Sequence, residues 1–125
     1  MGVHGFSSTE AEAFEQAALA MTAVITDLRR VEAHEAVAIE CEAPDRELLF
    51  AEWLNSLIYE MSTRRMLFSR FSVQLHGEGL RAQAWGEHVD PVRHRPVVEV
   101  KGATYTALRV ALEHGEWLAQ TVVDV

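Results

Sequence analysis

The chain has 125 residues, of which 49% are hydrophobic and 24% charged, and its formal net charge at pH 7 is −8. This length and balance predict one soluble domain, residues 1–125, that buries a substantial core. The acidic charge argues against direct nucleic-acid binding, which needs clustered Lys and Arg, and no apolar run is long enough to span a membrane. The single cysteine, Cys41, excludes an internal disulfide and, with no signal-peptide pattern at the amino end, fits a cytoplasmic location.

Two amphipathic helices are predicted in the first half of the chain. Thr9 and Glu12 have the spacing of a capping box, and apolar residues follow at steps of three and four as far as about residue 29. A second helix is expected after Asp45, a good N-cap, and continues to about Ser62 with one apolar face. Stripes of this kind are typical of helices that pack on a sheet.

Most of the remaining sequence alternates between apolar and polar residues, which is typical of strands. The expected strands cover residues 37–41, 71–75, 80–84, 97–101, 104–112 and 117–125. Glycines around residue 78 and residue 115 predict two hairpins, and the last strand, apolar on both faces, is expected inside a sheet. Cys41 lies on an apolar side and is interpreted as a buried, inert thiol. The chain is therefore predicted to be an α+β domain in which two amphipathic helices pack on a largely antiparallel β-sheet.

Two charged residues, Glu99 and Lys101, interrupt the β-branched run of residues 97–101. Because side chains alternate along a strand, both would point the same way and could pair or project together into a site. A half-exposed strand with a solvated charge pair is the simpler interpretation, since surface pairs are common and contribute little.

The carboxyl end carries two acidic groups side by side. We expect the Asp124 side chain and the α-carboxylate of Val125 to lie within a few ångströms of each other. Such oxygen ligands suit Ca²⁺, Mg²⁺ or Mn²⁺, while a frayed, solvated terminus is the alternative. His88 and His94 have a spacing that argues against a metal site of their own. No phosphate-binding loop, nucleophile elbow or zinc-protease helix is present.

Several segments, in order and over nearly the whole chain, resemble the archease family. The most specific are Glu99-Val100-Lys101 followed by Thr104-Tyr105, and the ending Val122-Val123-Asp124-Val125. The other similar segments are Gly2-Val3-His4-Gly5-Phe6, Thr9 with Glu12, Ala13-Phe14, Ala17-Ala18-Leu19-Ala20-Met21, Thr26-Asp27, Trp53-Leu54, Leu57-Ile58-Tyr59, Gly86-Glu87, Asp90-Pro91 and Arg93-His94.

The resemblance implies an accessory protein of the GTP-dependent RNA ligase that joins tRNA halves after intron removal. Such a protein promotes guanylylation of the ligase and its multiple turnover, and is not itself the catalyst. The resemblance also implies that Asp124 and Val125 are ligands of a divalent cation, with Ca²⁺ as first candidate and Mg²⁺ or Mn²⁺ as alternatives. Lys101 and Glu99 would be functional residues near that site. Electrostatic attraction between an acidic accessory protein and a basic ligase would assist their encounter.

One departure from the family pattern concerns the amino end. The family has a His-Thr-Ala-Asp segment just before the glycine that matches Gly2, and its Asp completes the cation site. Here Met1 stands directly after the place of that Asp, so we expect this chain to lack the family's first strand segment. With two carboxylates instead of three, cation affinity should fall and the site could be empty.

Two further interpretations compete with this one. A chaperone-like protein–protein interaction module would hold a client on a sheet face or strand edge and keep its activity under chelation. A small hydrolase would use Glu99, Asp124 and a bound metal, but no nucleophile or organised base accompanies them. The sequence leaves the bound metal, the oligomeric state and the ligase-binding surface undetermined.

Overall fold

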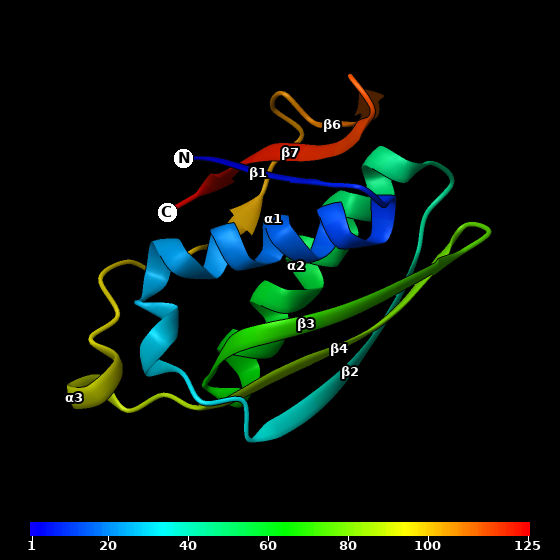
Figure 1. The fold of residues 1–125 in the computed structure, drawn as a ribbon. Coiled ribbons are helices and arrows are strands. Elements are labelled where there is room, and N and C mark those ends of the chain that lie inside the picture. Colours follow the sequence, from blue (N-terminus) through cyan, green and yellow to red (C-terminus); the bar gives the residue numbers. More distant parts are fainter.

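The computed structural model describes residues 1–125 and has three layers, with two helices held between two antiparallel β-sheets (Figure 1). In chain order the elements are β1 (Gly2–Ser7), α1 (Glu10–Ile25), the 3₁₀ helix η1 (Leu28–Arg30), β2 (Glu35–Glu42), α2 (Arg46–Arg64), β3 (Met66–His76), β4 (Gly79–His88), α3 (Pro91–His94), β5 (Gly102–Ala103), β6 (Arg109–Glu113) and β7 (Glu116–Asp124). The predicted α+β class is confirmed, and the strands divide between two sheets instead of forming one.

The sheet below the helices in Figure 1 consists of β2, β4 and β3 in that order, and we call it the hairpin sheet. Its strands are 8, 10 and 11 residues long and pair antiparallel along most of their length. The β3–β4 turn contains Gly77 at φ +60°, a left-handed conformation that glycine adopts without strain. The predicted hairpin is confirmed here.

The sheet above the helices, which we call the terminal sheet, is built around β7. β1 pairs with one edge of β7, while β6 and β5 pair with successive parts of its other edge. The last strand is therefore interior, as predicted. β1 was not predicted: its alternation is hidden by Gly2 and Gly5, and it is a strand because β7 offers it an unpaired edge.

Helix α1 starts as predicted and ends earlier than predicted. The Thr9 hydroxyl accepts a hydrogen bond from the Glu12 amide at 3.2 Å, which caps the amino end. The prediction of a helix to about residue 29 was wrong, because Thr26 is extended and its hydroxyl donates to the His94 carbonyl at 2.5 Å. Asp27 then caps a separate short turn, η1.

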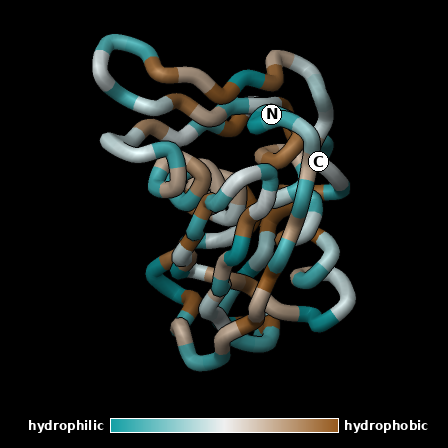
Figure 2. The backbone as a smooth tube through the Cα atoms, turned by 90° about the vertical axis from the view of Figure 1, so that its right-hand side faces the viewer, coloured by the Kyte–Doolittle hydropathy of each residue, from teal (hydrophilic) through white to brown (hydrophobic).

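A buried tryptophan of helix α2 contacts both helix α1 and the hairpin sheet. Asp45 caps the helix by accepting from the Leu48 amide at 2.8 Å. Trp53 is fully buried, donates from Nε1 to the Phe14 carbonyl of α1 at 3.1 Å, and meets Phe71 of β3 edge to face. Residues of both helices and both sheets thus form one apolar cluster, and hydrophobic and hydrophilic positions alternate along the backbone in Figure 2. No helix combines the length and the apolar character needed to cross a membrane.

The predicted strand over residues 97–101 was wrong. Residues 95–101, which we call the strap, have no regular structure and are fixed by two backbone bonds, from Val97 N to Ile25 O at 2.9 Å and from Lys101 N to Asp124 O at 2.8 Å. Different partners hold the two ends, so no continuous ladder forms, and only the short β5 pairs with β7.

The strand predicted over residues 104–112 begins only at Arg109. Thr104 explains the delay, because its hydroxyl donates to the Val122 carbonyl at 2.8 Å and accepts from the Thr106 amide at 3.2 Å. These bonds hold a turn that includes Ala107 at φ +54°. The second hairpin, β6 to β7, is confirmed.

Candidate functional site at the chain ends

The carboxyl end of β7 brings together two of the residues singled out in the sequence. The Lys101 amide donates to the Asp124 carbonyl at 2.8 Å, and the next residue, Gly102, is the register partner of Asp124 in the sheet. Lys101 and Asp124 are both exposed, and Val125 is half exposed. The sequence positions 101 and 124 therefore meet through a backbone contact that leaves both side chains open to a partner.

The amino end lies at the same edge, next to the carboxyl end in both Figure 1 and Figure 2. The Met1 ammonium donates to the Val123 carbonyl at 3.3 Å, and the Val123 amide donates to the Met1 carbonyl at 2.8 Å. The β1–β7 register pairs Gly2 with Val122. By this register, a residue placed directly before Met1 would stand opposite Asp124.

The donor set at this edge is too small for a closed cation site. No group of three or more His, Cys, Asp or Glu residues is arranged to hold a metal ion anywhere in residues 1–125. Asp124 and the Val125 carboxylate offer at most four oxygens, whereas Ca²⁺ takes about six to eight. The residues present do not by themselves enclose a divalent cation.

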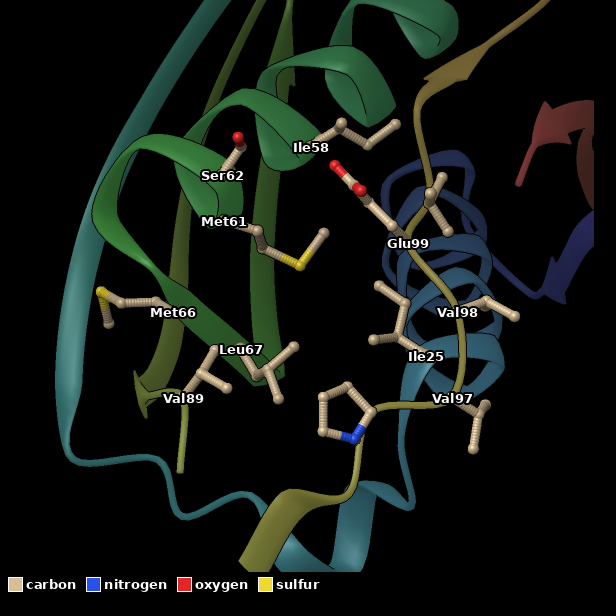
Figure 3. A pocket seen from close by; sticks show the side chains of 12 residues that line it. Ile25, Ile58, Met61, Ser62, Met66, Leu67, Val89, Val97, Val98 and Glu99 are labelled. Carbon is tan, nitrogen blue, oxygen red and sulfur yellow. The ribbon is translucent and has the colours of Figure 1, made fainter. Parts of the chain in front are cut away.

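Glu99 and Lys101 do not lie on a strand, so the alternation that would have placed them on one face does not apply. Of the two, only Glu99 lines the pocket beneath the strap, where its carboxylate is directed toward Ile58 of α2 (Figure 3). This pocket has a volume of about 430 Å³ and lies between the strap, the carboxyl ends of both helices and the start of β3. The aligned charge pair expected from alternation is therefore replaced by two residues with different surroundings.

A buried polar cluster beside the strap was missed by the sequence reasoning. His94 is 1% exposed, its Nδ1 accepts from the Asp90 amide at 2.8 Å, and its Nε2 lies 3.3 Å from Oε2 of Glu87 without hydrogen-bond alignment. Glu87 also accepts from the Glu32 amide and pairs with Arg93. The Asp90-Pro91 pair could have predicted this cluster, because it is a typical helix start. The short helix that follows turns residues 93 and 94 back toward the end of β4.

The electrostatics of Glu87 follow from this cluster. Burial acts to raise the pKa of its carboxyl, but hydrogen bonds from the Glu32 amide and Arg93, with the His94 contact, outweigh burial and lower the pKa to about 2. Glu87 is thus a fixed anion that holds α3, and with it the start of the strap, against the hairpin sheet.

The predicted buried thiol of Cys41 needs a small correction. Cys41 is half-buried on β2, with its Sγ 3.5 Å from the Ser56 hydroxyl of α2. Burial raises the pKa of the thiol, which disfavours the reactive thiolate. Its predicted low reactivity therefore agrees with its surroundings, although the residue is less buried than expected.

Comparison with known proteins gives consistent matches over the full length. The family model described as the Archease protein family matches residues 1–125. The chain is 36% identical to Protein archease of Pyrococcus furiosus over 130 residues, which covers 100% of this chain and 92% of that protein. It is 38% identical to Protein archease of Methanopyrus kandleri over 124 residues, with 96% and 89% of the two chains covered.

Two solved structures have the same architecture. Protein 1598 of Methanobacterium thermoautotrophicum is 33% identical and superposes with a TM-score of 0.85, covering 99% of this chain and 91% of that one. A Thermotoga maritima protein described as an archease and possible chaperone superposes with a TM-score of 0.62, covering 100% and 90%. At 15% identity, the second likeness concerns the fold alone.

Proposed function

This chain belongs to the archease family, and on that basis we propose that it is an accessory protein of a GTP-dependent RNA ligase in tRNA splicing. In this role it promotes guanylylation of the ligase and repeated turnover, and the ligase performs the chemistry. With a single cysteine and no disulfide, the proposed setting is the reducing cytoplasm.

The observation that carries the proposal is the hydrogen bond from the Lys101 amide to the Asp124 carbonyl. It holds a free ammonium group beside the acidic end of β7, and both side chains are exposed. An ammonium group is a good donor to a phosphate or a carboxylate, and it would contact such a group on the ligase. Asp124 and the Val125 carboxylate would orient a donor or cation of the ligase site.

We include in the proposal a divalent cation that binds weakly at the carboxyl end of β7, next to Asp124 and Val125. Ca²⁺ is the first candidate, with Mg²⁺ and Mn²⁺ as alternatives, because all three prefer carboxylate oxygens. The β1–β7 register supports the idea that an acidic residue before Met1 would complete the site opposite Asp124. We therefore expect that a His-Thr-Ala-Asp extension before Met1 raises Ca²⁺ affinity in calorimetry about tenfold over a His-Thr-Ala-Ala extension. Equal affinities would remove the cation from the proposal.

The test of the ligase role is the rate of guanylylation of the partner ligase with GTP. We expect Asp124→Ala and Lys101→Ala each to lower the stimulation at least about tenfold, because each removes a charged contact at the ligase. Glu116→Ala is the matched control, since Glu116 is exposed on the same strand at its other end. If both variants stimulate the ligase as well as the parent does, the assignment is wrong.

A chaperone-like interaction module is the second candidate. The apolar pocket beneath the strap supports it. The two functions differ in their response to EDTA, because a cation-dependent cofactor loses its stimulation on chelation while a client-holding module keeps its binding. Suppression of client aggregation that persists in EDTA, without any effect on guanylylation, would favour the module.

A further inference from the structure

The pocket beneath the strap combines apolar walls with one carboxylate. Nine of its twelve lining residues are hydrophobic, including Met61 at the end of α2 and Met66 at the start of β3. Figure 3 shows the side chains of Met61, Leu67 and Ile25 around an open space, with Glu99 of the strap directed toward Ile58; those of Met66 and Val98 point away from it. A volume of about 430 Å³ lies within the range of ligand-binding pockets, and methionine side chains adapt their shape to an occupant.

The lining of this pocket carries a negative charge, because Glu99 is its only charged residue. No ion pair in the structure includes Glu99, and no Lys or Arg lines the pocket. Arg64 at the end of α2 is paired with Glu60, while Arg65 and Arg95, next to lining residues in the sequence, are exposed and do not line the pocket. Both α1 and α2 end at the pocket, and helix carboxyl ends carry partial negative charge. An occupant with a cationic group would therefore be favoured over a neutral or anionic one.

The rim of the pocket extends its apolar surface toward solvent. Val97 is 76% exposed and Val98 is 37% exposed, although both are β-branched residues that usually pack in a core. Exposed apolar residues next to a pocket are typical of surfaces that bind another protein. The strap is tied down by backbone bonds at Val97 and Lys101 and by the buried side chain of Val100, so Val98 and Glu99 are the residues between them that can adjust.

We propose that this pocket docks a segment of a protein partner in which a large apolar side chain stands beside a Lys or Arg. The apolar side chain fills the space between Met61, Leu67 and Ile25, and the cation pairs with Glu99. This inference does not depend on the ligase role, because none of the pocket residues is Lys101, Asp124 or Val125, and it specifies the partner chemistry of the pocket that the second candidate function would use.

Three six-carbon probes of different charge test the chemistry directly by NMR on the isolated protein. We expect hexylammonium to bind in the millimolar range, more tightly than hexanol, and hexanoate to bind weakest. The signals that move should be the amides of residues 97–100 and the methyl groups of Met61 and Leu67. If these signals do not move, or if the three probes bind equally, the proposal is overturned.

Variants separate the charged part of the site from the apolar part. Glu99→Gln should weaken hexylammonium binding roughly fivefold, to the level of hexanol, and leave hexanol binding unchanged. Glu42→Gln, at the far end of β2, is the matched control and should change neither. Ile58→Ala should weaken both probes about two- to threefold, because it removes apolar contact without removing charge. Equal effects of Glu99→Gln and Glu42→Gln would contradict the assignment of Glu99.

A pair of labelled peptides then tests the class of partner by fluorescence polarisation. One peptide carries Leu-Lys and the other Leu-Glu in the same neutral sequence. Only the Leu-Lys peptide should have a higher affinity for the parent protein than for the Glu99→Gln variant. Equal binding of the two peptides would overturn the proposal. The proposal would also be overturned if the NMR signals of the pocket residues shifted with protein concentration alone, because the occupant would then be a second copy of this chain. Asp124→Ala should keep the probe binding, so a failed ligase role and a failed pocket give different results.

Discussion

The two sheets on either side of the helices are built from different parts of the chain. The hairpin sheet has strands of 8, 10 and 11 residues, and its β3–β4 hairpin pairs neighbours in sequence. The terminal sheet has strands of 6, 2, 5 and 9 residues, and it pairs residue 2 with residue 122. Long regular ladders resist local opening, whereas short pieces held by distant contacts leave ends and loops free. The exposed candidate groups accordingly lie on the terminal sheet and its strap.

The largest effect is expected where α2 meets the hairpin sheet. Trp53→Ala removes the buried indole between Phe14 and Phe71 and the side-chain hydrogen bond that it donates to the Phe14 carbonyl. We expect a loss of about 4 kcal/mol in the free energy of unfolding, measured by urea denaturation. Tyr59→Ala on the same helix is the control, because Tyr59 is 63% exposed and should cost about 0.5 kcal/mol or less. A similar cost for both variants would contradict the central position of Trp53.

The close contact between the terminal sheet and α1 gives the next largest effect. A Cβ at Gly5 would lie 2.4 Å from the Ala13 carbonyl oxygen and 2.4 Å from the Ala17 nitrogen, and these backbone atoms cannot move aside cheaply. We expect Gly5→Ala to cost about 2 to 3 kcal/mol. A Cβ at Gly2 meets nothing within 4 Å, so Gly2→Ala should have little effect.

Hydrogen exchange of the Gly5→Ala variant tests the difference between the sheets. Amides of β1 and β7 should lose protection first, while those of β3 and β4 stay protected, because their pairing is local. Loss of protection in both sheets together would mean that the two behave as one cooperative unit.

A smaller effect is expected at the link between α2 and the terminal sheet. The Asn55 amide group accepts from the Ala103 amide at 2.9 Å and donates to the Ala103 carbonyl at 3.4 Å, which anchors β5. Asn55→Ala should cost about 1 to 2 kcal/mol and increase exchange at residues 101–104. Glu52→Ala, an exposed position on the same helix, is the control. Unchanged exchange in Asn55→Ala would assign the anchoring of β5 to its pairing with β7.

The smallest effect concerns the acid limb of stability. The pKa of Glu87 is about 2 in the folded chain and near about 4.3 in an unfolded one. A lowered pKa gives stability that is complete above about pH 4.3 and is lost as the pH falls toward 2. Between about pH 4.3 and pH 2, we expect the free energy of unfolding of Glu87→Gln to fall by about 1 kcal/mol less than that of the parent. Between pH 6 and 8 the difference in stability between the two proteins should stay nearly constant. Parallel acid limbs would show that the α3 contact is not held by the charge of Glu87.

Elements that depend on local signals were predictable. Asp45 and Thr9 begin helices as N-caps, and the alternation that flanks Gly77 gives the hairpin, because these preferences act within a few residues. The carboxyl end of α1 was not predictable, because Thr26 leaves the helix to bond a carbonyl 68 residues away in sequence. The candidate site was predictable only in part. The charged residues Lys101 and Asp124 could be seen in the sequence, but the family resemblance, and not the strand pattern, singled them out as functional.

The sequence by itself determined the α+β class, the two amphipathic helices, the local hairpins and the acidic carboxyl end. Only the tertiary structure decided that the strands form two sheets, that residues 95–101 become a strap, and that Glu99, although exposed, lines a pocket that Lys101 does not reach. The physical reason is that turn and cap preferences are local energies, whereas the pairing of Met1, Lys101 and Asp124 around β7 exists only after distant segments have met.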